Sequence, residues 1–113
     1  MTLEKARYII GYFSTLMTEQ ERLALRHCQS TYKLDGVENQ NLVNAYYKND
    51  WLSTDAEVLD HLTEGPDQFM INAAMLILRE SPDEVFLNLC PVCKKLARTP
   101  DAKQCRFCGH DWH

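Results

Sequence analysis

The length of 113 residues and the net charge of −4 allow one hydrophobic core, or a small domain with a metal-stabilised appendage. Apolar residues make up 45% and charged residues 25%, with only four Gly and four Pro, which describes an ordered, soluble chain. The longest apolar stretch lies within residues 69–78 and is far shorter than the ~20 residues that a membrane-spanning helix needs. We therefore expect no membrane segment.

The first residues do not form a signal peptide. Residues 1–5 lack the basic leader, the apolar run and the small-residue cleavage site of an exported chain. We therefore expect a cytoplasmic protein whose cysteines stay reduced, because disulfides belong in oxidising compartments.

Two helices are predicted in the first third of the chain. Apolar residues recur every three or four positions over residues 3–17, and we interpret Gly11 within them as a point where another helix crosses closely, with a tolerated defect in the helix as the alternative. Thr18 and Glu21 form a capping box that opens a second helix to about residue 34, where Gly36 ends it. The residues of this second helix expected to face the core are Leu23, Ala24, Cys28 and Tyr32.

The next predicted helices follow at residues 39–48 and from a second capping box, Thr54 with Glu57, to about residue 65. Pro66 suits the first turn of a fifth helix, which runs to residue 80 and is apolar on almost all sides. Such a helix belongs in the centre of a bundle or in an oligomer interface. A third capping box, from Ser81 to Glu84, predicts a short helix through residue 87.

Two Cys-x-x-Cys pairs near the C-terminus predict a four-thiolate metal site. The pairs are Cys90/Cys93 and Cys105/Cys108. Two intervening residues let a tight turn direct both sulfurs at one point, and a second such turn completes a tetrahedron around Zn²⁺ at about 2.3 Å per bond. Gly109 can take a positive φ where the second turn closes, whereas Lys94 occupies the matching place in the first.

With these two turns, or knuckles, residues 88–113 resemble the zinc-ribbon families. The resemblance implies a short β-hairpin that carries Cys90, Cys93, Cys105 and Cys108 as the ligands of Zn²⁺. It implies no particular task, because zinc ribbons occur in nucleic-acid binders, enzymes and interaction modules alike. No family resemblance extends over residues 1–87.

Three alternatives to this site stay open. Iron in a rubredoxin-like redox site would use the same four sulfurs. Two disulfides would leave one of the five cysteines unpaired. His110 or His113 could replace a thiolate, but a ligand so soon after Cys108 would tighten an already short turn, so we favour the all-cysteine set.

The fold expected from the sequence is mainly α, with a bundle of about five helices over residues 1–87 and a zinc ribbon over residues 88–113. No Gly/Ser linker separates them, so we expect the ribbon to be docked on the helices.

The adjacent His27 and Cys28 would point about 100° apart on a helix, which argues against a catalytic dyad.

The function that we predict is a protein-interaction or adaptor module and not an enzyme. Four thiolates leave no open coordination position for a substrate, so the zinc would be structural. The partner would be another protein, and the sequence leaves both its identity and any homo-oligomer open.

The second interpretation is a nucleic-acid-associated regulator. Residues 88–113 contain five Lys or Arg against two Asp, a net +3, and the rest of the chain carries −7. The basic contact set would be Lys94, Lys95, Arg98, Lys103 and Arg106 with Phe107. We favour it less, because Zn²⁺ with four thiolates adds −2 and the acidic helices would oppose a phosphate backbone.

Overall fold

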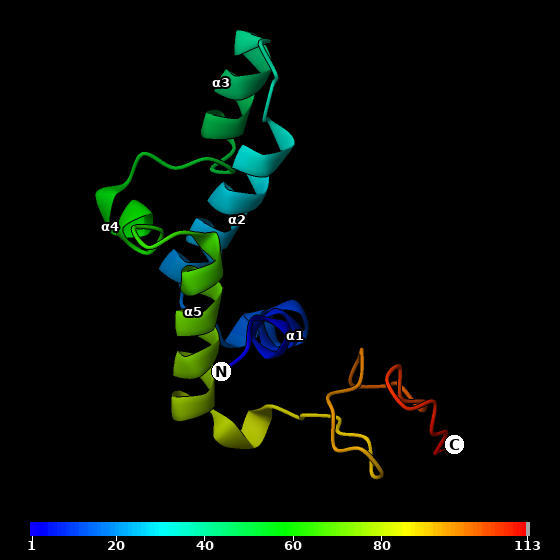
Figure 1. The fold of residues 1–113 in the computed structure, drawn as a ribbon. Helices are drawn as coiled ribbons and strands as arrows, with labels where there is room; N and C mark the ends of the chain where they lie inside the picture. The colour runs from blue at the N-terminus through cyan, green and yellow to red at the C-terminus, as the bar shows by residue number, and fades with distance from the viewer. Residues whose placement is uncertain (113) are drawn as a thin grey trace.

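The computed structural model describes residues 1–112 and confirms a mainly helical protein. The elements in chain order are α1 (Leu3–Phe13), the 3₁₀ turn η1 (Ser14–Leu16), α2 (Glu19–Lys33), α3 (Gln40–Lys48), α4 (Ala56–Asp60), α5 (Pro66–Glu80) and the 3₁₀ turn η2 (Pro82–Glu84). Figure 1 shows α3 at one end of the molecule and the C-terminal segment towards the other. The molecule is elongated, 51 × 30 × 22 Å, with a radius of gyration of 16.8 Å. None of the helices in this part of the chain combines the length and the apolar character that crossing a membrane requires.

The β-hairpin expected of a ribbon does not appear in residues 85–112. This segment contains two isolated antiparallel bridges, Leu89 with Leu96 and Gln104 with Asp111. Each bridge joins the two sides of a single Cys-x-x-Cys turn, so the pairing stays within one knuckle and does not join the two.

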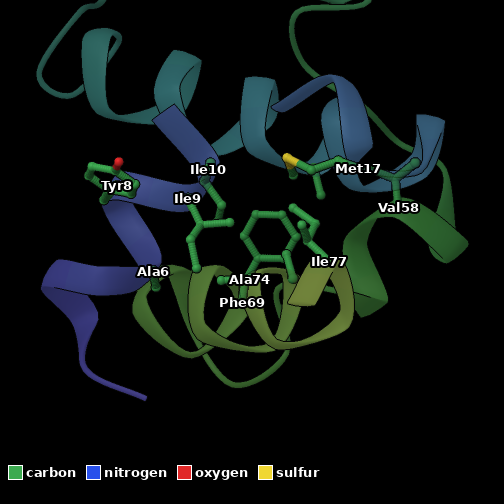
Figure 2. Packing of buried hydrophobic residues seen from close by; sticks show 11 residues of the cluster. Ala6, Tyr8, Ile9, Ile10, Met17, Val58, Phe69, Ala74 and Ile77 are labelled. Atoms are coloured by element: carbon green, nitrogen blue, oxygen red, sulfur yellow. The ribbon is translucent and has the colours of Figure 1, made fainter. Parts of the chain in front are cut away.

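The core is built mainly where α1 packs against α5, the most extensive contact between two helices. Ile9 and Ile10 of α1 and Phe69 and Ile77 of α5 are buried together (Figure 2). Burying an isoleucine or phenylalanine side chain contributes about 1.5–3 kcal/mol. Of the two positions expected for α5, burial on all sides within the helical core is not observed, because Met75 is 53% exposed.

The capping residues explain where the helices begin. The Thr18 hydroxyl accepts from the Glu21 amide at 3.1 Å and the Glu21 carboxylate accepts from the Thr18 amide at 2.9 Å, which confirms the first capping box. The second is wrong by one residue: Asp55 caps α4 and accepts from the Glu57 amide.

The third predicted capping box fails, and only the short turn η2 forms. The Ser81 amide donates to the Ile77 carbonyl at 2.8 Å, which makes Ser81 the last residue to close α5. Its side chain makes no capping hydrogen bond to the turn that follows. The chain is not helical over residues 85–112, which include the four clustered cysteines.

Two further expectations about packing are wrong. Gly11 is exposed, and no atom lies within 4 Å of the position that a Cβ would occupy, so no element crosses there. Tyr32 does not face the core but is 85% exposed.

α1 also ends at Phe13 instead of residue 17, because the turn η1 follows and brings Met17 into the core.

An arm of residues 30–52 projects from the core and carries exposed apolar side chains. α3 lies on this arm and buries none of its residues. The exposed large apolar residues are Tyr32, Val37, Leu42, Tyr47 and Trp51. At the base of the arm, the Ser53 amide donates to His27 Nδ1 at 3.0 Å, and burial lowers the pKa of His27.

Tyr8 connects α1 to the segment that precedes the cysteines. Its side chain is 5% exposed, and its hydroxyl donates to the Phe86 carbonyl at 2.7 Å and accepts from the Asn88 amide at 3.3 Å. Burial raises the pKa of Tyr8, although the Asn88 N–H opposes this rise. The phenol therefore satisfies two backbone groups at the start of residues 88–112, which carry the four clustered cysteines and are called the metal-binding segment below.

Replacement of Tyr8 by Phe should lower the free energy of unfolding by about 1–3 kcal/mol, because it leaves the Phe86 carbonyl and the amide of the buried Asn88 without this partner. Chemical denaturation followed by circular dichroism measures the change. Tyr12→Phe is the matched control, since Tyr12 lies on the same helix but is 52% exposed. An equal loss of stability in the two variants would contradict the role assigned to the Tyr8 hydroxyl.

Candidate metal centre

The four predicted cysteines come together in space. The sulfur atoms of Cys90, Cys93, Cys105 and Cys108 all lie within 4.8 Å of one another. Two close pairs cross between the knuckles: Cys90 Sγ is 3.6 Å from Cys108 Sγ, and Cys93 Sγ is 3.5 Å from Cys105 Sγ. Four sulfurs around one Zn²⁺ at about 2.3 Å would lie about 3.8 Å apart. The donor set and its spacing therefore fit a single metal ion.

Two backbone amides point at the first sulfur of each knuckle. The amides of Val92 and Cys93 donate to Cys90 Sγ, each at 3.4 Å. In the second knuckle, the amides of Phe107 and Cys108 donate to Cys105 Sγ at 3.3 and 3.4 Å. Such hydrogen bonds stabilise the thiolate form, which is the form that ligates a metal.

The two knuckles have the same hydrogen-bond pattern fifteen residues apart. The amide of Cys90 donates to the Lys95 carbonyl at 2.9 Å, and that of Cys105 donates to the His110 carbonyl at 2.8 Å. The Leu89–Leu96 bridge likewise corresponds to the Gln104–Asp111 bridge. Each half of the centre is therefore the same local structure, built from a different sequence.

The main difference between the halves is the residue that closes each turn. Gly109 has φ +79° and Lys94 has φ +65°, so both lie in the left-handed region. A side chain in this region costs about 1–2 kcal/mol, and glycine avoids that cost. Lys94 Nζ donates to the Pro91 carbonyl at 2.9 Å, which partly offsets the strain within its own turn.

The proximity of the sulfurs prevents them from ionising independently. The Cys108 N–H lowers the pKa of Cys105 to about 6 despite burial. The pKa of Cys93 rises to about 11: the Lys95 N–H would lower it, but burial and the three neighbouring sulfurs raise it more. A bound cation removes this conflict, because its positive charge favours the ionised form of every thiol that coordinates it.

No histidine belongs to this cluster within residues 1–112. The His110 ring stacks on Trp112, with centroids 6.1 Å apart and an angle of 24° between the planes. His113, the other alternative ligand, lies outside the described residues. All five cysteines are free, so no disulfide links the described thiols, and Cys28 lies on α2 outside the cluster.

Two residues that hold this segment in place carry no signal in the sequence. Asn88 is 7% exposed, and its side-chain amide donates to the carbonyls of Thr99 and Ala102 at 3.0 and 2.9 Å. Tyr8 holds the backbone of Asn88 from eighty positions away. Neither residue type forms a recognisable motif with the cysteines, and only their positions in the fold show the connection.

Comparison of the chain with protein-family models, with curated protein sequences and with solved structures gives no match. The likeness to zinc ribbons thus rests on the four cysteines and the geometry of their two knuckles.

Separate substitutions of the two turn-closing residues, Lys94 and Gly109, should change metal affinity in opposite directions. Lys94→Gly relieves the left-handed side chain and should raise metal affinity, whereas Gly109→Lys introduces one and should lower affinity about tenfold, for a cost of about 1–2 kcal/mol. Competition with a chromophoric chelator measures both affinities. Gly36→Lys is the control, because Gly36 has φ +77° but lies far along the chain from the cysteines. A Gly109→Lys variant that retains the metal as well as the unmodified chain would contradict this account.

Proposed function

We propose that this chain is a non-catalytic interaction module in which Cys90, Cys93, Cys105 and Cys108 hold one structural Zn²⁺. The observation that carries the proposal is the convergence of four sulfurs within 4.8 Å, with knuckle amides directed at two of them. Four thiolates would fill the tetrahedral coordination of Zn²⁺ and leave no position for a substrate or a catalytic water. The metal would then act on the fold, because its binding free energy becomes folding free energy for the segment that it holds together.

Metal analysis should return close to one zinc per chain, and Cys93→Ser should abolish it. A double His110→Ala and His113→Ala variant should keep its zinc if the ligands are the four cysteines alone. Iron is the alternative ion for the same sulfurs, and it would make the purified protein coloured. Loss of the ion in the double histidine variant, or a coloured protein with one iron, would contradict the proposed centre.

Removal of the ion should disorder the residues after Leu89 but leave most of the helical circular dichroism, since the buried apolar cluster lies mainly on α1, α2 and α5. Trp112 fluorescence should then shift towards that of an exposed indole, while Trp51 on the arm stays unchanged. Each tryptophan is observed alone by replacing the other with Phe. Collapse of the helices together with loss of the metal would show one cooperative unit and overturn the division into residues 1–87 and 88–113.

The arm is the surface that we assign to the protein partner. Leu42 and Tyr47 are 42% and 43% exposed on a helix that buries none of its residues. A nine-residue helix is only marginally stable in water without packing. Coverage of these side chains by a partner protein would both bury apolar area and stabilise α3.

Leu42→Glu should therefore abolish capture of a specific partner by the tagged chain in a pull-down from the native cell. Met75→Glu is the matched control, because Met75 is similarly exposed on α5 but does not lie on the arm. Metal-stripped protein shows whether the partner also needs the metal-binding segment. Equal capture by the Leu42 variant and the unmodified chain would exclude the arm as the binding surface.

A further inference from the structure

Two neighbouring hollows lie along the metal-binding segment, one of them where this segment meets α1. The first has a volume of about 330 Å³, and its lining includes Arg7, Tyr12, Arg98 and Arg106. The second has a volume of about 590 Å³, and its lining includes Lys103 together with the same Arg98 and Arg106. The two shared arginines make the hollows parts of one surface.

We define the junction surface as Arg7, Tyr12, Arg98, Lys103, Arg106 and Phe107. The guanidinium of Arg106 lies 4.9 Å from the centroid of the Phe107 ring and extends the surface to this side chain. Two elements far apart in the sequence therefore contribute: Arg7 and Tyr12 come from α1, and the other four residues come from the metal-binding segment.

Positive charge is concentrated on this surface although the chain as a whole carries −4. It contains three arginines and one lysine. Three carboxylates lie near it: Glu4, which forms an ion pair with Arg106, Asp101, whose charge acts on the Tyr8 phenol, and Asp111, which is bridged to Gln104. Arg7, Arg98 and Lys103 lie outside the Glu4–Arg106 ion pair. The surface therefore suits an anionic ligand.

Exposed aromatic rings beside the cations narrow the chemistry of that ligand. Tyr12 is 52% exposed and packs against Tyr8, with centroids 5.6 Å apart, so its outer face is held towards solvent. Phe107 is 47% exposed, with Lys95 and Arg106 each 4.9 Å from its centroid. Flat rings interleaved with basic side chains bind single strands, whose bases stack while the phosphates meet the cations. An acidic peptide could use the charges but has no comparable use for two exposed rings.

We propose that the junction surface binds single-stranded nucleic acid, with Arg7, Arg98 and Lys103 on phosphates and with Tyr12 and Phe107 stacked on bases. This binding goes beyond the proposed interaction module and uses a surface that shares no residue with the arm. It depends on the metal only through the placement of the segment that carries Arg98, Lys103 and Phe107. A failure of zinc binding and a failure of strand binding are therefore separate observations.

The test is a fluorescence-anisotropy titration of the full, metal-loaded chain with labelled single-stranded DNA and RNA of mixed sequence, each about 12 nucleotides long. If these three cations contact phosphates, affinity should fall roughly 20-fold between about 50 and about 200 mM salt. The double variant Arg7→Glu and Arg98→Glu should weaken binding more than tenfold. The double variant Lys33→Glu and Lys48→Glu changes the charge equally on α2 and α3 and should leave binding within threefold.

The contribution of stacking is tested separately. Tyr12→Ala should weaken binding about fivefold or more, as expected for loss of one base–aromatic stack. Tyr32→Ala removes an exposed tyrosine from the arm and should have no effect. Arg7→Gln with Arg98→Gln is a milder pair, and zinc content and circular dichroism verify that each variant is folded.

Failure to bind either single strand at low salt would overturn the proposal, as would equal weakening by the arm controls. Binding of polyglutamate or of a duplex of the same sequence as tightly as the single strand would also overturn it. Those results would assign the surface to anions in general and not to exposed bases. Full affinity for the single strand in a double Tyr12→Ala and Phe107→Ala variant would also overturn the proposal, because the binding would then not involve stacking on these rings.

Discussion

Four sulfur atoms within 4.8 Å impose the main constraint on residues 88–112. Thiolates at such distances repel one another and do not ionise independently: the Cys108 N–H lowers the pKa of Cys105, whereas burial and the neighbouring sulfurs raise the pKa of Cys93. The knuckle hydrogen bonds, the Asn88 amide and the Tyr8 hydroxyl all act to hold the sulfurs at one point. A divalent ion would turn this repulsive cluster into the most strongly held part of the segment.

The cysteines and most helices could be predicted because their signals are local. The spacing of Cys90 and Cys93 determines a turn irrespective of the rest of the fold, and Thr18 with Glu21 satisfies the helix end with two side chains close in sequence. The third capping box could not be resolved in this way, because Ser81 also lies at the end of α5 and its amide closes that helix. The same sequence signal is compatible with two structures there, and the preceding helix determines which one forms.

The contacts that position the candidate sites depend on distant pairs of residues, and these had no signature in the sequence. Tyr8 bonds to backbone groups about eighty positions away. Arg7 joins the basic residues of the metal-binding segment only through the placement of α1. The basic contact set expected from the sequence contained only residues near the cysteines and therefore did not include Arg7. Exposed Tyr32 shows the converse: helical periodicity pointed it inwards, but the arm extends past the core that would have covered it.

The elongated shape has a hydrodynamic consequence. A compact chain of about 113 residues would have a radius of gyration near 13 Å, whereas this protein has 16.8 Å because the arm and the metal-binding segment extend from the helical core. That radius corresponds to a spherical domain of roughly twice the length. A monomer would therefore elute earlier from a gel-filtration column calibrated with globular standards than a compact chain of its mass. The association state of this protein has to be measured by light scattering or sedimentation equilibrium, which report mass independently of shape.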